Sequence, residues 1–244
     1  MARNFDLSVG EYYHLYNRGT EKRNIFITNS DRARFLGLLF LCNDIEPVHI
    51  SNYQGSTLMD WLAWPRTGTI VDIGAYCLMP NHFHLLVKEK EENGISSFMQ
   101  KVLTAYTMYF NKKNNRTGAL FAGRFKARHA NSDEYLKYLI SYIHLNPVKM
   151  IEPKWKDVGI RNMQKARTFL EEYRFSSYAE YAGQIRPESN IIDKKTVPEY
   201  FSQKNTFKRT IRDWLTYKEN PEKIHQGSTS LNTSRFNLAE QWPV

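Results

Sequence analysis

A tight turn between two apolar, strand-like runs is the feature that most limits what this chain can fold into. Residues 70–78 and 82–88 are typical strands, and the Met-Pro-Asn turn at 79–81 predicts that they form an antiparallel hairpin. Side chains two residues apart on a strand share a face, so His82 and His84 are expected side by side. Two imidazoles on a rigid strand can form half of a metal site. The alternative for an isolated His-x-His is a pair of surface histidines at a strand edge.

The pattern on either side of the hairpin predicts an α+β fold. In chain order we expect a strand at 12–17, a helix at 29–42, the hairpin, a helix at 95–113, an extended segment at 120–130 with a bend at Gly123, and a helix that begins at Ser132 or Asp133 and ends near Asn146. That order is the one of a ferredoxin-like split β-α-β unit with an antiparallel sheet and additional helices.

The chain is expected to divide into a main domain and a C-terminal extension. Residues 1–182 would form the main domain, with an irregular insertion near 44–69 that carries two tryptophans. A helix is expected at 163–172, inside the main domain. Residues 183–244 would form a polar linker to about residue 205, then a helix at 206–218 and a polar tail.

Composition favours a polyanionic partner. The chain of 244 residues has a formal net charge of +9 and a pI near 9.4, which suggests nucleic acid first and an anionic membrane surface second. No apolar run is long enough to span a membrane, and the N-terminus lacks a signal-peptide core. Cys42 and Cys77 stand in apolar surroundings without Cys-x-x-Cys spacing, so we expect reduced thiols and a cytoplasmic protein.

One stretch combines positive charge with aromatic rings. Between Asn93 and Ser132 there are seven basic residues and no acidic ones: Lys101, Lys112, Lys113, Arg116, Arg124, Lys126 and Arg128. The aromatic residues interleaved with them are Tyr106, Tyr109, Phe110, Phe121 and Phe125. Basic side chains can bind phosphates and aromatic rings can stack on unpaired bases, so this stretch predicts binding to single-stranded nucleic acid. A solvated basic face over an aromatic core remains the alternative, and the last three cations, alternating on an extended segment, favour phosphate contact.

The helix expected before Pro147 carries a second set of polar groups. At 100° per residue, its aliphatic residues share one face while Tyr138, Tyr142 and Asn146 form a neighbouring stripe. The Tyr142 hydroxyl could therefore reach a metal-bound phosphate, and the Asn146 amide oxygen could be a third metal ligand. The alternative is a packing tyrosine with its hydroxyl in water.

These motifs resemble those of a known enzyme group. The stretch 79–87 looks like the histidine-hydrophobic-histidine motif of the HUH endonuclease superfamily, and Tyr142-Ile-His-Leu-Asn-Pro-Val148 looks like the nucleophile helix of its single-tyrosine transposases. Residues 12–19, 118–126 and 174–178 resemble the first strand, last strand and following connector. Together, over roughly residues 12–183, they are similar to REP-associated tyrosine transposases. The insertion at 44–69 is longer than expected for that group, and nothing after residue 183 has a counterpart.

The resemblance implies nicking and joining of single-stranded DNA beside a hairpin. His82, His84 and Asn146 would hold Mg²⁺ or Mn²⁺, and Tyr142 would attack the phosphate to give a 5′-phosphotyrosine and a free 3′-hydroxyl. Arg18 and the basic residues of the 101–128 stretch would grip the DNA. Small transposases of the wider group act as dimers, whereas the REP-associated type implies a monomer; we expect a monomer and leave a dimer open.

Two other functions remain open at this point. A ferredoxin-like sheet could bind unpaired DNA or RNA without catalysis, with His82 and His84 in structural roles. A metal-dependent nuclease could instead use water as its nucleophile, which would cut DNA without a protein–DNA adduct. A domesticated relative that binds DNA but no longer moves it is not separable from the first transposase hypothesis by sequence.

Overall fold

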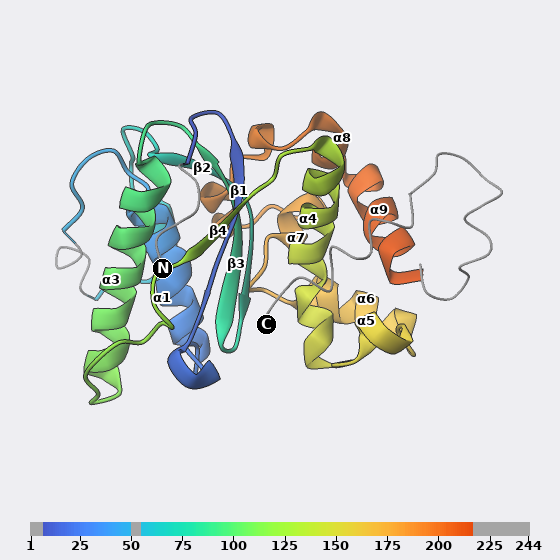
Figure 1. Ribbon diagram of the computed structural model, residues 1–244, viewed down its shortest axis with the longest axis horizontal. Coiled ribbons are helices and arrows are strands. Elements are labelled where there is room, and N and C mark those ends of the chain that lie inside the picture. Colours follow the sequence, from blue (N-terminus) through green and yellow to red (C-terminus); the bar gives the residue numbers. More distant parts are fainter. Residues whose placement is uncertain (1–6, 50–54, 217–244) are drawn as a thin grey trace.

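The computed structural model describes residues 7–49 and 55–216, which form a four-stranded antiparallel sheet between two helical layers (Figure 1). The strands are β1 (Tyr12–Arg18), β2 (Val71–Met79), β3 (His82–Glu89) and β4 (Lys126–His129). Their order across the sheet is β2-β3-β1-β4. The chain reaches β2 through α1 (Asn29–Leu41) and β4 through α3 (Gly94–Lys113). This is the ferredoxin-like arrangement, so the predicted fold class is confirmed.

Helices α1 and α3 cover one face of the sheet and form the first core with it (Figure 1). Alternate strand positions supply this core: Tyr13 and Leu15 of β1 and Phe83 and Leu85 of β3 are each at most 1% exposed. Because strand side chains alternate, the residues between them must face the opposite layer. This alternation sends both hairpin histidines to the other side of the sheet.

Helix α1 begins at residue 29, where the sequence pattern predicts it. Thr28 is the N-cap, and its hydroxyl accepts a hydrogen bond from the backbone of Asp31. The Asp31 carboxylate in turn accepts one from the Thr28 N–H at 2.7 Å. This capping box satisfies two backbone donors at once, which is why the helix begins here.

The described part of the 44–69 insertion packs against α1, and its Leu62 carbonyl accepts a hydrogen bond from the Asn190 side chain at 2.9 Å. Its short helix α2 (Leu58–Leu62) buries Trp61, which lies on Gly37. A Cβ on Gly37 would stand 2.2 Å from the Trp61 ring, so only glycine allows this contact. The Arg34 guanidinium covers the same ring at 4.4 Å. Residues 50–54 of the insertion lie outside the described part.

The fourth strand is shorter than the extended segment expected at 120–130. Only residues 126–129 pair continuously with β1, and Phe121 makes a single bridge to Gly19. Gly123, at φ +82°, turns the chain between these two contacts, where a bend was expected. Leu120 and Phe121 are drawn into the first core, which takes them out of line with the strand.

Helix α4 is the first helix, in chain order, of the layer that covers the other face of the sheet (Figure 1). The helices of this layer and its connections are α4 (Asp133–Leu145), η3 (Asn146–Met150), α5 (Trp155–Val158), α6 (Met163–Glu172), α7 (Tyr178–Tyr181), η4 (Pro187–Ile191), η5 (Lys194–Thr196), α8 (Glu199–Ser202) and α9 (Lys204–Thr216), and a single turn η1 (Thr20–Lys22) follows β1. Ser132 caps α4 by accepting from the Tyr135 N–H. The second core joins Leu139 and Ile143 of α4 to Ala75 and Cys77 of β2.

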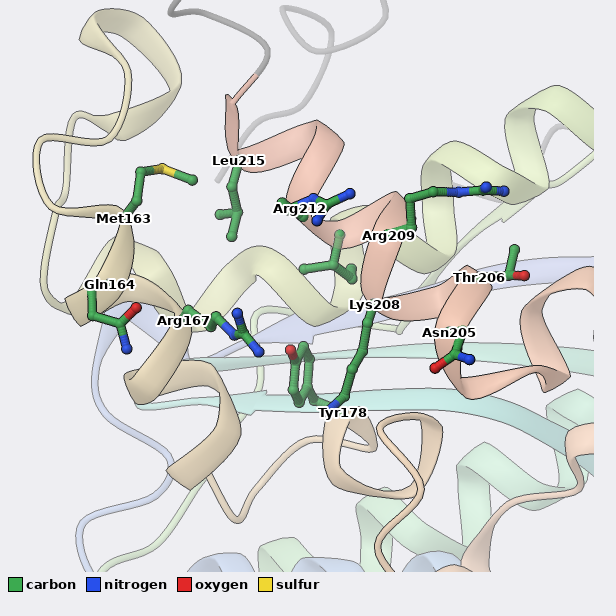
Figure 2. Close-up of a pocket in the computed structure, with 11 residues that line it drawn as sticks. Met163, Gln164, Arg167, Tyr178, Asn205, Thr206, Lys208, Arg209, Arg212 and Leu215 are labelled. Atoms are coloured by element: carbon green, nitrogen blue, oxygen red, sulfur yellow. The ribbon is translucent and has the colours of Figure 1, made fainter.

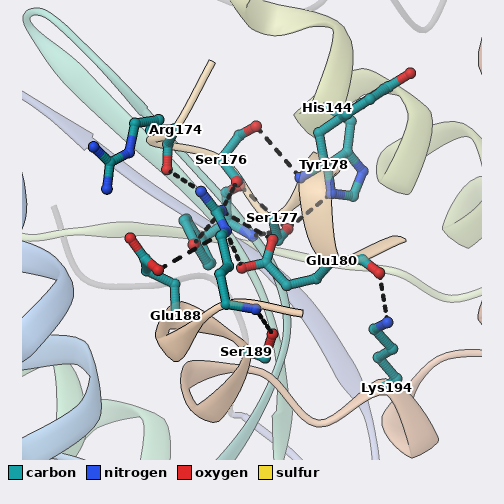
Figure 3. A network of polar contacts seen from close by, with 11 residues as sticks. His144, Arg174, Ser176, Ser177, Tyr178, Glu180, Glu188, Ser189 and Lys194 are labelled. Atoms are coloured by element: carbon teal, nitrogen blue, oxygen red, sulfur yellow. Dashed lines mark hydrogen bonds and ion pairs between the residues drawn. The ribbon is translucent and has the colours of Figure 1, made fainter. Parts of the chain in front are cut away.

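The stretch from 183 to 205, expected to be a linker, is packed against the rest of the protein. Ile191, Val197 and Phe201 are each no more than 4% exposed. A buried ion pair fixes its start, because the Arg186 guanidinium donates to both carboxylate oxygens of Glu180 at 2.7 and 2.9 Å (Figure 3). The sequence did not predict this packing because the few apolar residues of this stretch are widely spaced among polar ones.

The last predicted helix is present as α9, whose Phe207, Ile211 and Leu215 are buried. Its expected end at residue 218 lies outside the described part of the chain, as does the tail. Cys42 and Cys77 are free, buried thiols. No helix among residues 7–49 and 55–216 is long and apolar enough to cross a membrane.

Candidate active site

The two hairpin histidines lie on the sheet face that α4 covers. Their rings are 4.9 Å apart between centroids and nearly perpendicular, at 87°. On the neighbouring strand β1, Arg18 pairs with His82 and Tyr16 pairs with His84. His84 is 5% exposed, so these are not two surface histidines at a strand edge.

Tyr142 of α4 meets these histidines across the second core. Its ring centroid lies 5.4 Å from that of His84, with an interplanar angle of 82°. One turn later, Asn146 donates its side-chain N–H to the Tyr142 carbonyl at 2.8 Å. Pro147 follows and α4 gives way to η3, so the amide stands at the end of the helix. The structure thus brings Tyr142 to His84, which stands beside His82, and places Asn146 one turn after Tyr142 on the same helix.

Hydrogen bonds leave metal-binding atoms available at two of these residues. His82 Nδ1 lies 2.6 Å from the side-chain oxygen of Asn81, which can only accept, so Nδ1 carries the proton and Nε2 the lone pair. Among the described residues, neither His82 Nε2 nor Asn146 Oδ1 has a hydrogen-bond partner, although both atoms are buried. Buried polar atoms without partners are costly unless something binds them. A divalent cation fits this donor set.

The donor set is nevertheless an unusual one by residue type. It contains two histidines and an amide, and the described residues hold no group of three or more His, Cys, Asp or Glu side chains placed to bind a metal. Two neutral nitrogens and one neutral oxygen leave the cation's charge uncompensated. Negative phosphate oxygens would therefore be its natural further ligands.

A third histidine belongs to the site, and the sequence analysis assigned it no role. His14 of β1 is fully buried, and its Nε2 lies 2.9 Å from His84 Nδ1. The two rings stack at 5.0 Å. The only sequence signal was its place on an alternating strand two residues from Tyr16. Such a hydrogen bond fixes the orientation of the His84 ring.

Burial sets the protonation states of the site. Burial, assisted by the charges of Arg128 and His82, lowers the pKa of His14 to about 3. Burial, with the charges of Lys149 and Arg18, lowers the pKa of His82 to about 4. Both imidazoles are therefore neutral near pH 7. Burial raises the pKa of the Tyr142 phenol above its ordinary value, so the hydroxyl keeps its proton in the absence of a nearby cation.

Some of the predicted DNA-binding cations lie beside this site. Arg18 is placed by its pairing with His82, and Lys126 and Arg128 by pairing with Tyr16 and His14. The Lys126 ammonium lies 5.9 Å from the Tyr16 ring centroid. Arg124 is exposed in the loop that leads into β4. Lys149 of η3, which the sequence analysis did not single out, adds positive charge near His82.

The remaining predicted cations lie on or just after α3, which packs on the opposite face of the sheet: Lys101, Lys112, Lys113 and Arg116. Lys113 forms an ion pair with Asp31 at 2.6 Å, and Arg116 donates to the carbonyl of Ala119. The structure does not bring these cations to the Tyr142 face. Of the aromatic residues interleaved with them, Tyr106, Phe110 and Phe121 are buried in the first core, where they are unavailable for stacking on bases.

Part of the chain matches the model of a known protein family. Residues 67–146 match the model of a family described as "Transposase IS200 like", which confirms the resemblance read from the motifs. This segment runs from just before β2 to the end of α4 and contains His82, His84, Tyr142 and Asn146. No curated protein matches the chain.

Among solved structures, that of a REP-associated tyrosine transposase bound to a REP hairpin aligns with this chain. The TM-score is 0.46 and the identity 12%, over 77% of this chain and 89% of that one.

Proposed function

We propose that this chain, which carries an IS200-like transposase segment, nicks and rejoins single-stranded DNA beside a hairpin through a bond to Tyr142. The observation that carries the proposal is the meeting of the Tyr142 ring with His84 at 5.4 Å, with Asn146 one turn away. Helix packing alone does not require a phenol to lie against one of two adjacent imidazoles in the core.

In the proposed step, the Tyr142 oxygen forms a bond to the scissile phosphorus and loses its proton. The bond from phosphorus to the 3′-oxygen breaks, and that oxygen takes up a proton to become a free 3′-hydroxyl. The DNA 5′-phosphate stays attached to Tyr142 as an ester. Because the phosphotyrosyl ester conserves the energy of the broken phosphodiester bond, a second 3′-hydroxyl can attack it, reverse the step and join a new strand.

The residues of the chain position and neutralise the phosphate in this scheme. His82 through Nε2, His84 and Asn146 through Oδ1 would hold Mg²⁺ or Mn²⁺, which would supply charge withdrawal from the scissile phosphate. Arg18 and Lys149, whose charges act on His82, would offset negative charge at the same point. Lys126 and Arg128 on the edge strand β4 would bind neighbouring phosphates.

A monomer would suffice for this reaction. Tyr142 on α4 and both histidines on β3 come from one chain and meet through its own core, so we propose a monomer as the working unit. A DNA substrate also makes the cytoplasm the proposed place of action.

A covalent adduct tests the proposal directly. The protein is incubated with a labelled single-stranded hairpin and Mn²⁺, denatured and run on a gel, and the shifted band is digested to locate the modified peptide by mass spectrometry. We expect a DNA adduct on the peptide that contains Tyr142. Cut DNA without an adduct would instead identify a nuclease that uses water. Binding without cutting, across a range of hairpins, would leave only a DNA-binding module.

His14 offers a test of the metal site that does not depend on activity. Replacing His14 with Leu removes the partner of His84 Nδ1, so the His84 ring loses its fixed orientation. We expect Mn²⁺ affinity, measured by calorimetry without DNA, to fall about 10- to 100-fold, as for other partners of metal ligands. The matched control is His129→Leu, on the same sheet but paired with Glu11 at the surface. An equal loss in both variants would contradict a role for His14.

A further inference from the structure

The second helical layer contains a groove that the proposed chemistry does not use. It lies between α6 and α9 and has a volume of about 610 Å³ (Figure 2). Four cationic side chains line it: Arg167 from α6, and Lys208, Arg209 and Arg212 from α9. Within the described part of the chain, none of its lining residues carries a carboxylate. The groove is therefore positively charged along its length.

The amphipathic pattern of α9 explains why the cations gather there. Phe207, Ile211 and Leu215 recur every four residues and are no more than 5% exposed, so this stripe anchors the helix in the second core. The basic residues flank the stripe and must therefore lie at its border with solvent. Ile211 and Leu215 form part of the groove floor. In Figure 2, Arg167 and Lys208 extend toward Tyr178 from the two facing helices.

The existing ion pairs of these cations are weak and can be exchanged for phosphate. Arg167 pairs with Glu171 at 3.2 Å and Arg212 with Asp213 at 3.9 Å. Both arginine side chains are more than half exposed, at 58% and 68%. Surface pairs of this kind contribute little, with a median of about 0–1 kcal/mol. Lys208 and Arg212 are one turn apart, roughly 6 Å along the helix axis, so they can meet successive charges of an extended polyanion.

We propose that this groove binds the phosphodiester backbone of a single-stranded stretch of the DNA whose hairpin is processed at Tyr142. The proposal rests on the proposed function for the identity of the strand. Contacts link the two places: Trp214 of α9 packs edge-on against Tyr138 at 5.4 Å, and Tyr138 stacks on Tyr142 at 5.9 Å. In this proposal, helix α9 would contact the DNA strand on one face, while its Trp214 contacts the helix that carries Tyr142.

A membrane surface fits the groove less well than a nucleic acid. Peripheral membrane binding needs apolar side chains that project outward into the lipid. Here the apolar floor residues Ile211 and Leu215 are 2% and 5% exposed, and no large exposed hydrophobic side chain lies among the lining residues. A recessed apolar floor with cations at its edges suits a sugar-phosphate chain with sequence-independent contacts.

The test compares two triple variants that remove the same charge. The groove variant is Lys208→Gln, Arg209→Gln and Arg212→Gln, and the control is Lys90→Gln, Lys154→Gln and Lys195→Gln, three exposed lysines elsewhere on the surface. The probe is a labelled oligo-dT of about 16 nucleotides, near the upper site size of one single-strand-binding fold. Its affinity is measured by fluorescence anisotropy at several salt concentrations, after thermal melts show that both variants fold.

We expect the groove variant to lose at least about tenfold in affinity for oligo-dT near 0.1 M salt. The slope of log affinity against log salt concentration should also become shallower by about 2, because three phosphate contacts are lost. The control should keep the slope of the unmodified protein. Equal losses in the two variants would overturn the proposal. So would unchanged oligo-dT affinity with lost binding to phosphatidylserine vesicles, which would indicate a membrane surface.

Adduct formation separates this proposal from the proposed function. If no covalent DNA adduct forms but the groove variant still loses oligo-dT affinity, the transposase chemistry fails and the groove remains a nucleic-acid site. If the adduct forms and the two variants bind alike, the chemistry stands and the groove proposal fails.

Discussion

Replacing Tyr142 with Phe is expected to abolish the protein–DNA adduct and strand joining. The change removes only the hydroxyl oxygen that would bond to phosphorus, and it keeps the ring that packs against His84. Losing the nucleophile of a covalent mechanism costs several orders of magnitude in rate, on the order of 10⁴-fold or more. The measurement is the rate of adduct formation and of strand joining on a labelled hairpin, with the affinity for uncut DNA recorded alongside.

Tyr138→Phe is the matched control for this experiment. Tyr138 lies one turn earlier on α4, is partly buried and stacks on Tyr142 at 5.9 Å. Its hydroxyl is not expected to react, so this variant should retain the adduct within about tenfold, the effect of about 1.4 kcal/mol. If Tyr142→Phe keeps normal strand joining, the nucleophile is another group and the proposed function is wrong.

The second large effect is expected on stability. Glu180 is fully buried, and its carboxylate is held by Arg186, whose side chain is 14% exposed. Glu180→Ala would leave the buried guanidinium with the backbone carbonyls of Arg174 and Ser176 and with only the more distant Glu188 carboxylate, at 4.0 Å, as a countercharge (Figure 3). Breaking a buried pair from one side costs about 3–5 kcal/mol. We expect that loss in the free energy of unfolding, measured by urea denaturation.

A double variant distinguishes the ion pair from simple packing. Arg186→Leu combined with Glu180→Leu removes both charges, so it should be less destabilising than the sum of the two single changes. As a surface comparison, Lys137→Ala breaks an exposed pair with Asp133 at 3.0 Å and should cost less than about 1 kcal/mol. If Glu180→Ala lowers the free energy of unfolding by no more than Lys137→Ala does, the buried pair contributes no more to stability than an exposed one.

The sheet and the convergence of the site residues were predictable because they follow local rules. The Met79-Pro80-Asn81 turn fixes the hairpin, and period-two alternation puts His82 and His84 on one face. Pro147 ends the helix and leaves Asn146 one turn after Tyr142, as helix geometry requires. The meeting of that helix with the hairpin was expected from family resemblance, since no pattern within one segment specifies how two segments pack.

The features that the sequence did not predict depend on long-range contacts. His14 joins the site through a hydrogen bond to His84, 70 residues later in the chain. Residues 183–205 lack a periodic apolar stripe, yet Ile191 and Phe201 are buried in the core. Lys113 was counted as a DNA contact, whereas it pairs with Asp31, 82 residues earlier. In each case the partner, and therefore the role, is decided by tertiary structure.

Tyr142 on α4 and the two histidines on β3 are held in place relative to one another by the packing of the second core, and this has an evolutionary consequence. Reactive groups must hold their separation to well within 1 Å, since an error of that size can cost about 100-fold in rate. Here α4 packs on the sheet through fully buried residues such as Ala75 of β2 and Leu139 of α4. Selection could therefore adjust the rate of strand exchange by changing the volume of these buried residues, while every reacting side chain stays the same.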